Sequence, residues 1–187
     1  MFLRKTKRRD PLPVTMSGVR MGERLLQVGT DSGSIVGALA AKVGLSGAAA
    51  IVVTDAATGE RARAQALNAG VLLDVHVTPL DRLPLEDATF DVVVVHNGGG
   101  EIARLEAATR GQAAREWHRA LRPGGRALII DRAPRRGLRA MVGGSVGENA
   151  SYAEAGGSVS VLESGGFRPV RTVGEVEGLT FTEGLKS

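Results

Sequence analysis

The order of short apolar runs and amphipathic segments limits the folds open to this chain more than any other feature. Continuous apolar runs separated by helical segments are typical of a parallel sheet that helices cover on both faces. Strands are predicted at residues 24–28, 49–55, 71–78, 90–97 and 127–131, and helices at residues 34–43, 58–70 and 101–121. Residues 122–126, "RPGGR", predict a sharp turn between the last of these helices and the following strand.

The C-terminal part of the chain has a different pattern. Residues 151–166 predict a modest helix that ends at two glycines. Residues 167–185 predict two strands joined near Glu177 and Gly178, as an antiparallel hairpin at the sheet edge. The predicted class is therefore α/β, a Rossmann-like, doubly wound and mostly parallel sheet of about seven strands with a C-terminal antiparallel hairpin.

Length and composition indicate one domain. With 187 residues, the chain is expected to form a single domain over residues 23–187, preceded by a basic, flexible lead-in at residues 1–22 where Pro11 and Pro13 oppose a helix. The absence of cysteine excludes disulfides and thiol nucleophiles. Neither a transmembrane run nor a secretion signal is recognisable, so a cytoplasmic location is expected.

The positive charge is concentrated at the N-terminus. Five basic residues precede residue 10, which leaves 19 basic against 20 acidic residues, or −1, for the rest of the chain. Such a tail can contact anionic lipid or nucleic acid, or can simply be a solvated end. With only 3% aromatic residues, base stacking has little support, and a small molecule is the expected partner rather than nucleic acid. The oligomeric state is left open.

A glycine-containing turn follows the first predicted strand. Gly29 and Gly33 allow close approach of a ligand to the backbone, and the next helix would begin beside it. The dinucleotide fingerprint needs glycine at positions 31 and 34, which hold Asp31 and Ser34. A carboxylate at position 31 would repel a pyrophosphate, whereas a cofactor with sulfonium and ammonium groups tolerates it.

Asp55 ends the second predicted strand. An acid at this place can accept hydrogen bonds from both hydroxyls of a cofactor ribose. It can equally cap the helix that follows. Both interpretations remain open at the level of sequence.

Four segments in this order resemble the class I S-adenosylmethionine-dependent methyltransferases, in particular the small-molecule branch called methyltransferase type 11. They lie within residues 22–131 and read "RLLQVGTDSG", "IVVTDAATGERARAQA", "LDRLPLEDATFDVVVVHN" and "REWHRALRPGGRALIID". The last segment, with its "L-R-P-G-G" turn, is the most specific. The resemblance implies S-adenosylmethionine as cofactor and a small-molecule methyl acceptor.

The resemblance also implies roles for residues of the first turn. Gly29 and Gly33 match glycines that contact the methionine part and ribose of the cofactor, and Asp31 replaces the middle glycine. Asp55 matches the ribose-binding acid. Gln27 stands where the family carries an acid before the turn, so one negative charge is missing there.

Further positions follow the third and fourth strands. Pro79 occupies the place of the acid that approaches the adenine amino group; Asp81, two residues on, can substitute for it or can be only solvated. His96 and Asn97 match the place that lines the methyl-transfer site. His96 is the candidate base if the acceptor is an oxygen; alternatively, both residues merely end the strand and cap the next turn. No metal-ligand cluster is evident.

These residues favour an S-adenosylmethionine-dependent methyltransferase acting on an unidentified small molecule. The alternative is a binding or scaffold protein with the methyltransferase fold that has lost turnover because its cofactor loop is degenerate. An NAD(P)-binding oxidoreductase is disfavoured by the failed glycine fingerprint.

Overall fold

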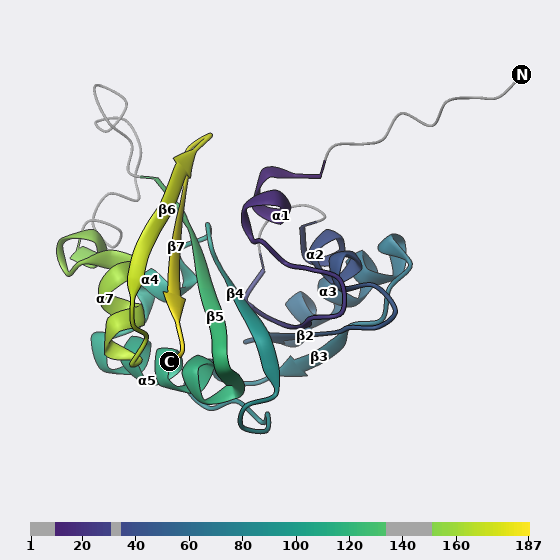
Figure 1. Ribbon diagram of the computed structural model, residues 1–187, viewed down its shortest axis with the longest axis horizontal. Helices are drawn as coiled ribbons and strands as arrows, with labels where there is room; N and C mark the ends of the chain where they lie inside the picture. The colour runs from purple at the N-terminus through teal and green to yellow at the C-terminus, as the bar shows by residue number, and fades with distance from the viewer. Residues whose placement is uncertain (1–9, 31–34, 134–150) are drawn as a thin grey trace, which may run out of the picture.

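A single sheet with the strand order β3-β2-β1-β4-β5-β7-β6 forms the centre of the protein (Figure 1). The computed structural model describes residues 10–30, 35–133 and 151–187. The strands are β1 Arg24–Val28, β2 Ala48–Val53, β3 Asp74–Val77, β4 Phe90–Asn97, β5 Leu121–Arg132, β6 Val170–Val176 and β7 Leu179–Leu185. Strands β1 to β5 run parallel, and β7 is antiparallel to both of its neighbours. The predicted fold class is confirmed.

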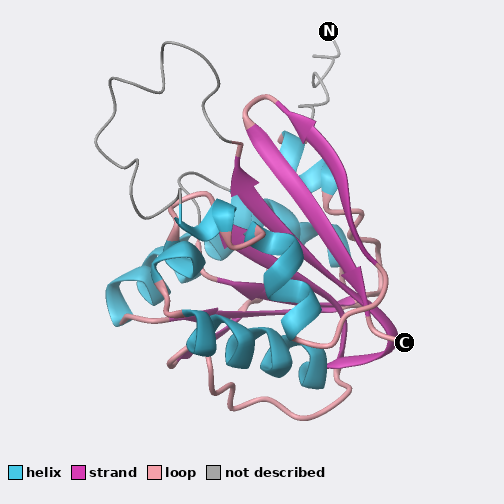
Figure 2. Ribbon diagram, turned by 90° about the vertical axis from the view of Figure 1, so that its left-hand side faces the viewer, coloured by secondary structure: helices cyan, strands magenta, loops and turns pink. Residues whose placement is uncertain are grey.

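Helices cover both faces of the sheet (Figures 1 and 2). One layer contains α1, α2 and α3, and the other contains α4, α5 and α7. Their bounds are α1 Leu12–Met16, α2 Ile35–Val43, α3 Ala56–Ala69, α4 Glu101–Arg104, α5 Ala107–Ala120 and α7 Gly157–Ser164. The helix α3 ends at Gly70 in the left-handed conformation, as the sequence predicts.

Strand β1 lies at the point where the strand order reverses. Val28, its last residue, pairs with Val52 of β2 on one side and with Val95 of β4 on the other. The carboxyl ends of these three parallel strands therefore meet at one edge of the sheet. Ligands of open α/β sheets bind at this kind of edge.

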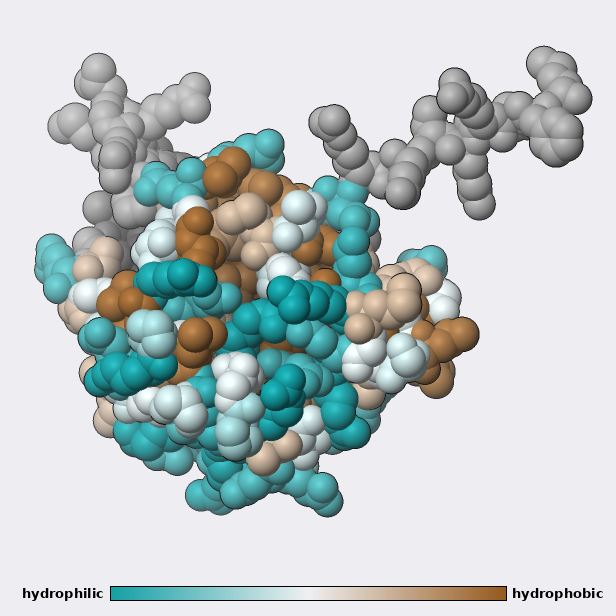
Figure 3. Space-filling model, viewed as in Figure 1, coloured by the Kyte–Doolittle hydropathy of each residue, from teal (hydrophilic) through white to brown (hydrophobic). Residues whose placement is uncertain are grey.

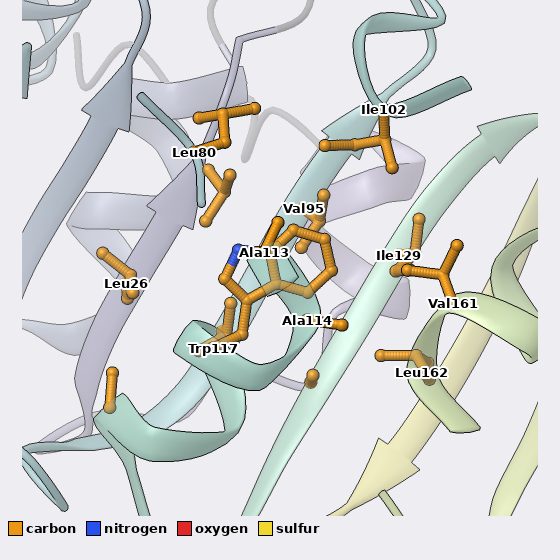
Figure 4. Packing of buried hydrophobic residues seen from close by; sticks show 14 of the residues in the cluster. Leu26, Leu80, Val95, Ile102, Ala113, Ala114, Trp117, Ile129, Val161 and Leu162 are labelled. Atoms are coloured by element: carbon orange, nitrogen blue, oxygen red, sulfur yellow. The ribbon is translucent and has the colours of Figure 1, made fainter. Parts of the chain in front are cut away.

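Alternating side chains of the central strands supply two cores, one for each helical layer. In β1, Leu25 packs toward α1 and α2, whereas Leu26 packs toward α5. The indole of Trp117, fully buried, lies among Leu26, Val95 and Ile129 (Figure 4). Trp117 thus joins α5 to the sheet, as expected for an aromatic residue on the inner face of a covering helix.

The C-terminal hairpin is confirmed. Glu177 and Gly178 connect β6 and β7 with φ angles of 52° and 75°, which are the left-handed values that a tight two-residue hairpin turn requires. Strand β7 inserts between β5 and β6, so β6 is the edge strand and most of its side chains are exposed. The molecular face that carries the hairpin mixes hydrophilic and hydrophobic groups (Figure 3).

The predicted helix over residues 101–121 is wrong in one respect, because two helices occupy this range. The backbone of Leu105 is extended, with ψ of 149°, and α5 starts anew after Glu106. The Arg110 guanidinium donates to the main-chain oxygens of Ala103 and Leu105. Because the helix is interrupted at Leu105, these two carbonyls have no intrahelical donor, and Arg110 supplies one.

The strands also differ in detail from the prediction. Strand β3 is shorter than residues 71–78. Residues 122–126 do not turn away from the sheet before β5 begins. Instead Leu121 already pairs with Phe90, and the ladder resumes where Arg126 pairs with Val92. The residues between them form an enlarged bulge within β5, with Gly124 at φ of 74°.

Residues 10–22 are more ordered than the sequence suggests. A short helix, α1, begins directly after Pro11 and includes Pro13 in its first turn. Proline is tolerated there because the first amides of a helix have no intrahelical acceptor. Val14 is buried against α2, so the expectation that these prolines oppose a helix is wrong. The division into lead-in and domain stays a prediction.

Several predicted features lie outside the described residues. They are the basic tail before residue 10, Asp31, Gly33 and Ser34 of the first turn, and residues 134–150. Within the described ranges, no helix combines the length and the apolar character needed to cross a membrane.

Replacing Trp117 by alanine should lower the free energy of unfolding by about 3–5 kcal/mol, because it leaves a large cavity between α5 and the sheet. Urea unfolding followed by circular dichroism measures this. Trp117→Phe is the matched control: it keeps an aromatic ring and removes an indole N–H that has no acceptor among the described residues. The loss should therefore be clearly smaller for Phe. Equal losses would contradict the assigned packing role.

Candidate functional site

Gly29 forms the bend at the carboxyl end of β1. Its amide donates to the Val52 oxygen at 2.8 Å, and its φ is +69°, a conformation that favours glycine. A Cβ at this position would lie 2.8 Å from the Glu101 Oε2 and 3.2 Å from the His96 main-chain oxygen. A side chain here would be strained by the backbone conformation, and its Cβ would require the Glu101 carboxylate to shift. The role of this bend in cofactor binding stays a prediction.

Gln27 and His96 form a buried polar pair beneath this bend. Gln27 Nε2 donates to the Val36 oxygen at 3.0 Å, and its Oε1 lies 3.0 Å from His96 Nε2. Because the amide oxygen can only accept, His96 must carry its proton on Nε2. The pair connects β1 and β4 with the first turn of α2.

This arrangement bears on His96 as the candidate base. Its side chain is 2% exposed, and the Nε2 proton is donated inward to Gln27. The side chain therefore has a structural function in the sheet, and it is the main-chain oxygen of His96 that faces Gly29. This favours the interpretation that His96 ends the strand. A role in proton transfer stays a prediction.

Asp55 caps α3. Its two carboxylate oxygens accept from the Thr58 amide at 2.8 Å and from the Thr58 hydroxyl at 2.7 Å. The hydroxyl bond, followed by the amide bond, lowers the pKa of Asp55, so the group is ionised at neutral pH. Capping does not exclude ribose binding, since each carboxylate oxygen has a further lone pair and the residue is exposed.

Asn97 is committed to neighbouring protein groups. Its amide donates to Asp131 at the end of β5, and its oxygen accepts from the Ile102 amide at 2.9 Å. Ser158 donates to the other Asp131 oxygen, and the Tyr152 hydroxyl donates to Ser158 at 2.9 Å. This hydrogen-bonded chain joins β4, β5, α4 and α7, so Asn97 helps to orient the site, and a contact between its side chain and a ligand stays a prediction.

Asp131 is the carboxyl group in this chain of hydrogen bonds, and it is largely buried. Burial raises its pKa, and the bonds from Ser158 and Asn97 oppose that change. Sequence reasoning did not identify Asp131 as a site residue. Its position at the end of a predicted central strand was the available signal, since such ends meet at the ligand edge.

Glu101 is a second residue that sequence reasoning missed. It is the first residue of α4, half-buried, and its carboxylate lies over Gly29. Burial raises its pKa; Arg104 opposes this, and the negative charge of Asp55 adds to it. The turns after β1, β2 and β4 lie at one edge of the sheet, because these three strands are parallel neighbours.

Pro79 and Asp81 follow β3, at the far end of this edge. Both lie in the turn around Leu80, which is buried together with Leu83. Asp81 is partly exposed, and none of the described hydrogen bonds or ion pairs involves it. The structure thus gives Asp81 space to meet a ligand, and the adenine contact stays a prediction.

The chemistry of the described edge suits S-adenosylmethionine. The bend at Gly29 has a left-handed φ of +69°, which favours glycine, and the Glu101 carboxylate lies beside it. Two carboxylates, Asp55 after β2 and Glu101 after β4, lie at this edge of the sheet and would complement the sulfonium and ammonium charges. The same pair would repel the pyrophosphate of a dinucleotide.

The raised pKa of Asp131 predicts a specific pH dependence of stability. The ordinary pKa of an aspartate is 3.8, and the pKa of Asp131 is higher than this in the folded state. The folded state therefore binds the Asp131 proton more tightly than the unfolded state does. Stability contributed by Asp131 is therefore fully present below pH 3.8 and is lost as the pH rises through the folded-state pKa. We therefore compare the free energy of unfolding of wild type with that of Asp131→Asn. Wild type minus variant should decrease as the pH rises from about 3.5 to about 7.

Urea titrations of both proteins at several pH values measure this difference. Glu154→Gln serves as the control, because it removes an exposed carboxyl two residues from Tyr152. A difference between wild type and Asp131→Asn that does not vary with pH, or that increases with it, would contradict the assignment.

Known proteins resemble this chain in sequence and fold. The methyltransferase domain family matches residues 26–129, more than half of the chain. The ubiquinone/menaquinone biosynthesis C-methyltransferase UbiE of Chromobacterium violaceum is 29% identical over 118 residues, covering 63% of this chain and 46% of that protein. Its counterpart from Azotobacter vinelandii is 30% identical over 120 residues, covering 63% and 46%. The chain thus spans about half the length of these relatives.

Solved structures show the same fold. A SAM-dependent methyltransferase from Aquifex aeolicus superposes with a TM-score of 0.74 at 21% identity, covering 93% of this chain and 87% of that one. A SAM-dependent methyltransferase from Methanosarcina mazei gives 0.65 at 17% identity, covering 95% and 99%. Family match, strand order and fold agree with the resemblance in the sequence. The chain belongs to the methyltransferase domain family, among the class I methyltransferases whose cofactor is S-adenosylmethionine.

Proposed function

We propose that this protein transfers a methyl group from S-adenosylmethionine to a small molecule, at the edge formed by the ends of β1, β2 and β4. The observation that carries the proposal is the left-handed bend at Gly29, which the Glu101 carboxylate approaches, at a sheet edge that also carries the exposed Asp55. When bound, the cofactor supplies a methyl group activated by a sulfonium. The protein's own task is then to hold the acceptor in line with that group.

The described residues have distinct tasks in this proposal. Asp55, ionised and exposed, accepts hydrogen bonds from the ribose hydroxyls while it continues to cap α3. The backbone at Gly29 and the His96 oxygen contact the methionine half. Asn97 and Asp131 hold the turn after β4 against β5. In this proposal, the turn lies beside the acceptor and keeps a fixed position.

An electron-rich carbon is the acceptor that we propose to test first. The relatives from Chromobacterium violaceum and Azotobacter vinelandii are named as C-methyltransferases of ubiquinone and menaquinone biosynthesis. The His96 imidazole donates into the sheet through Nε2. An acceptor carbon activated by its own hydroxyl substituents needs less help from a base than a neutral alcohol does.

Asp55→Asn should weaken binding of S-adenosylmethionine about tenfold, because the amide replaces one of the two acceptor oxygens by a donor. Asparagine is a good helix cap, so the free energy of unfolding should change little. Titration calorimetry and urea unfolding measure the two effects. Glu60→Gln, an exposed change on the same helix, should leave binding unaltered. Unchanged binding by Asp55→Asn would contradict the ribose contact.

Methyl transfer itself is tested with cofactor labelled in the methyl group and a panel of demethylated quinols. We expect label in the organic product and equimolar S-adenosylhomocysteine. Cofactor binding without transfer to any acceptor would favour the scaffold function, to which the neutral Gln27 lends support. Tight binding of NADH in place of S-adenosylmethionine would contradict both.

A further inference from the structure

The Glu101 carboxylate is unusual among the acidic groups of the described chain. It is half-buried against the Gly29 bend, yet no hydrogen bond reaches it from any described residue. Most other inward-facing acids here are paired: Glu116 with Arg119, Glu23 with Arg126, and Asp131 with Asn97. A partly desolvated carboxylate without a donor is costly, so a ligand that supplies a donor would relieve it.

The position of Glu101 is fixed by its surroundings. Gly100 before it has φ of 75°, and the Ile102 amide after it is held by Asn97 Oδ1. The nearby Arg104 guanidinium donates to the Gly99 oxygen at 2.8 Å. Backbone constraints on both sides therefore keep the first turn of α4 beside the end of β1.

The first strand supplies no negative charge, because Gln27 stands where the resemblance to the methyltransferases leads us to expect an acid. Gln27 is neutral and fully buried, and its amide groups are used by Val36 and His96. A cationic ligand group near the Gly29 bend therefore obtains no negative charge from β1 itself. The Glu101 carboxylate, which approaches the same bend from β4, can provide it.

The order of groups along the sheet edge matches the order of groups in the cofactor. Asp55 follows β2, Gly29 follows β1, and Glu101 follows β4, in a sheet where these strands are consecutive neighbours. A ligand whose ribose meets Asp55 would extend over Gly29 toward Glu101. In S-adenosylmethionine, the group beyond the ribose is the methionine half with its ammonium.

We propose that Glu101 binds the ammonium group of the cofactor, in place of the acid that related methyltransferases carry before the first glycine turn. This inference rests on the proposed function, because it assumes that S-adenosylmethionine occupies the edge. It assigns a cofactor contact to a residue outside the matched first motif. It also explains how a chain with Gln27 can retain a complementary charge.

The test compares three ligands by titration calorimetry with wild type and Glu101→Gln. S-Adenosylmethionine and S-adenosylhomocysteine both carry the ammonium, whereas 5′-methylthioadenosine keeps the adenosine and lacks the amino acid part. We expect the variant to lose about tenfold or more in affinity for the first two ligands and to bind the third as wild type does. Glu106→Gln, an exposed change before α5, is the matched control and should bind all three normally.

The remaining outcomes separate the two proposals. If wild type binds none of these ligands, the proposed function fails, and this inference fails with it. If wild type binds them and Glu101→Gln does too, only the assignment of Glu101 is overturned. Equal weakening of 5′-methylthioadenosine, or weakening of S-adenosylmethionine alone, would also overturn the ammonium contact. Thermal unfolding of Glu101→Gln, expected at or above the wild-type temperature because the variant removes a partly desolvated charge, shows that the comparison is made on folded protein.

Discussion

Strand β1 pairs in parallel with β2 on one side and with β4 on the other. The chain therefore adds β2 and β3 to one side of β1 and later crosses back to add β4 to its other side. The crossovers place helices on both faces and leave an open edge where the two halves of the sheet meet. Gly29 lies at this edge with φ of +69°, and the Glu101 carboxylate and the His96 main-chain oxygen approach it closely. Everything proposed about the ligand depends on that close approach.

Hydrogen bonds between buried polar side chains stabilise this edge of the sheet. The Gln27–His96 pair crosses from β1 to β4 within the core, and Asn97 and Asp131 continue the connection to β5. Buried polar groups destabilise a fold unless they are hydrogen-bonded, and here each of these groups has a partner. The same residues that occupy family site positions thus act in large part as structural supports. The groups facing the ligand are the backbone at Gly29 and the exposed or half-buried carboxylates.

The sequence predicted the sheet well because its strands are continuous apolar runs and its helices end at glycines such as Gly70. It failed where tertiary contacts decide the local structure. The break at Leu105 depends on Arg110 reaching back to two carbonyls, and α1 depends on burial of Val14 against a distant helix. No proline or glycine marks the break, and the two prolines at residues 11 and 13 are compatible with a helix start as well as with an irregular segment.

The candidate site was predictable only in part, for a related reason. Gly29 and Asp55 were found because their residue types and their positions after strands are informative. Glu101 and Asp131 were missed because their importance comes from what lies opposite them across the sheet edge. A glutamate at the start of a short helix is common, and only its approach to Gly29 distinguishes it.

The bond between Asp131 and Ser158 joins two residues that are 27 positions apart in the chain. Tyr152 is also attached to Ser158, so the described residues after position 150 are held against the end of β5. The entropy lost in closing a loop rises slowly with length, by about 0.6 kcal/mol for each doubling. Changes in the number of residues between Asp131 and Tyr152 should therefore alter the stability of the sheet little. Descendants of one ancestral scaffold could diverge in the molecules they accept by altering this stretch alone.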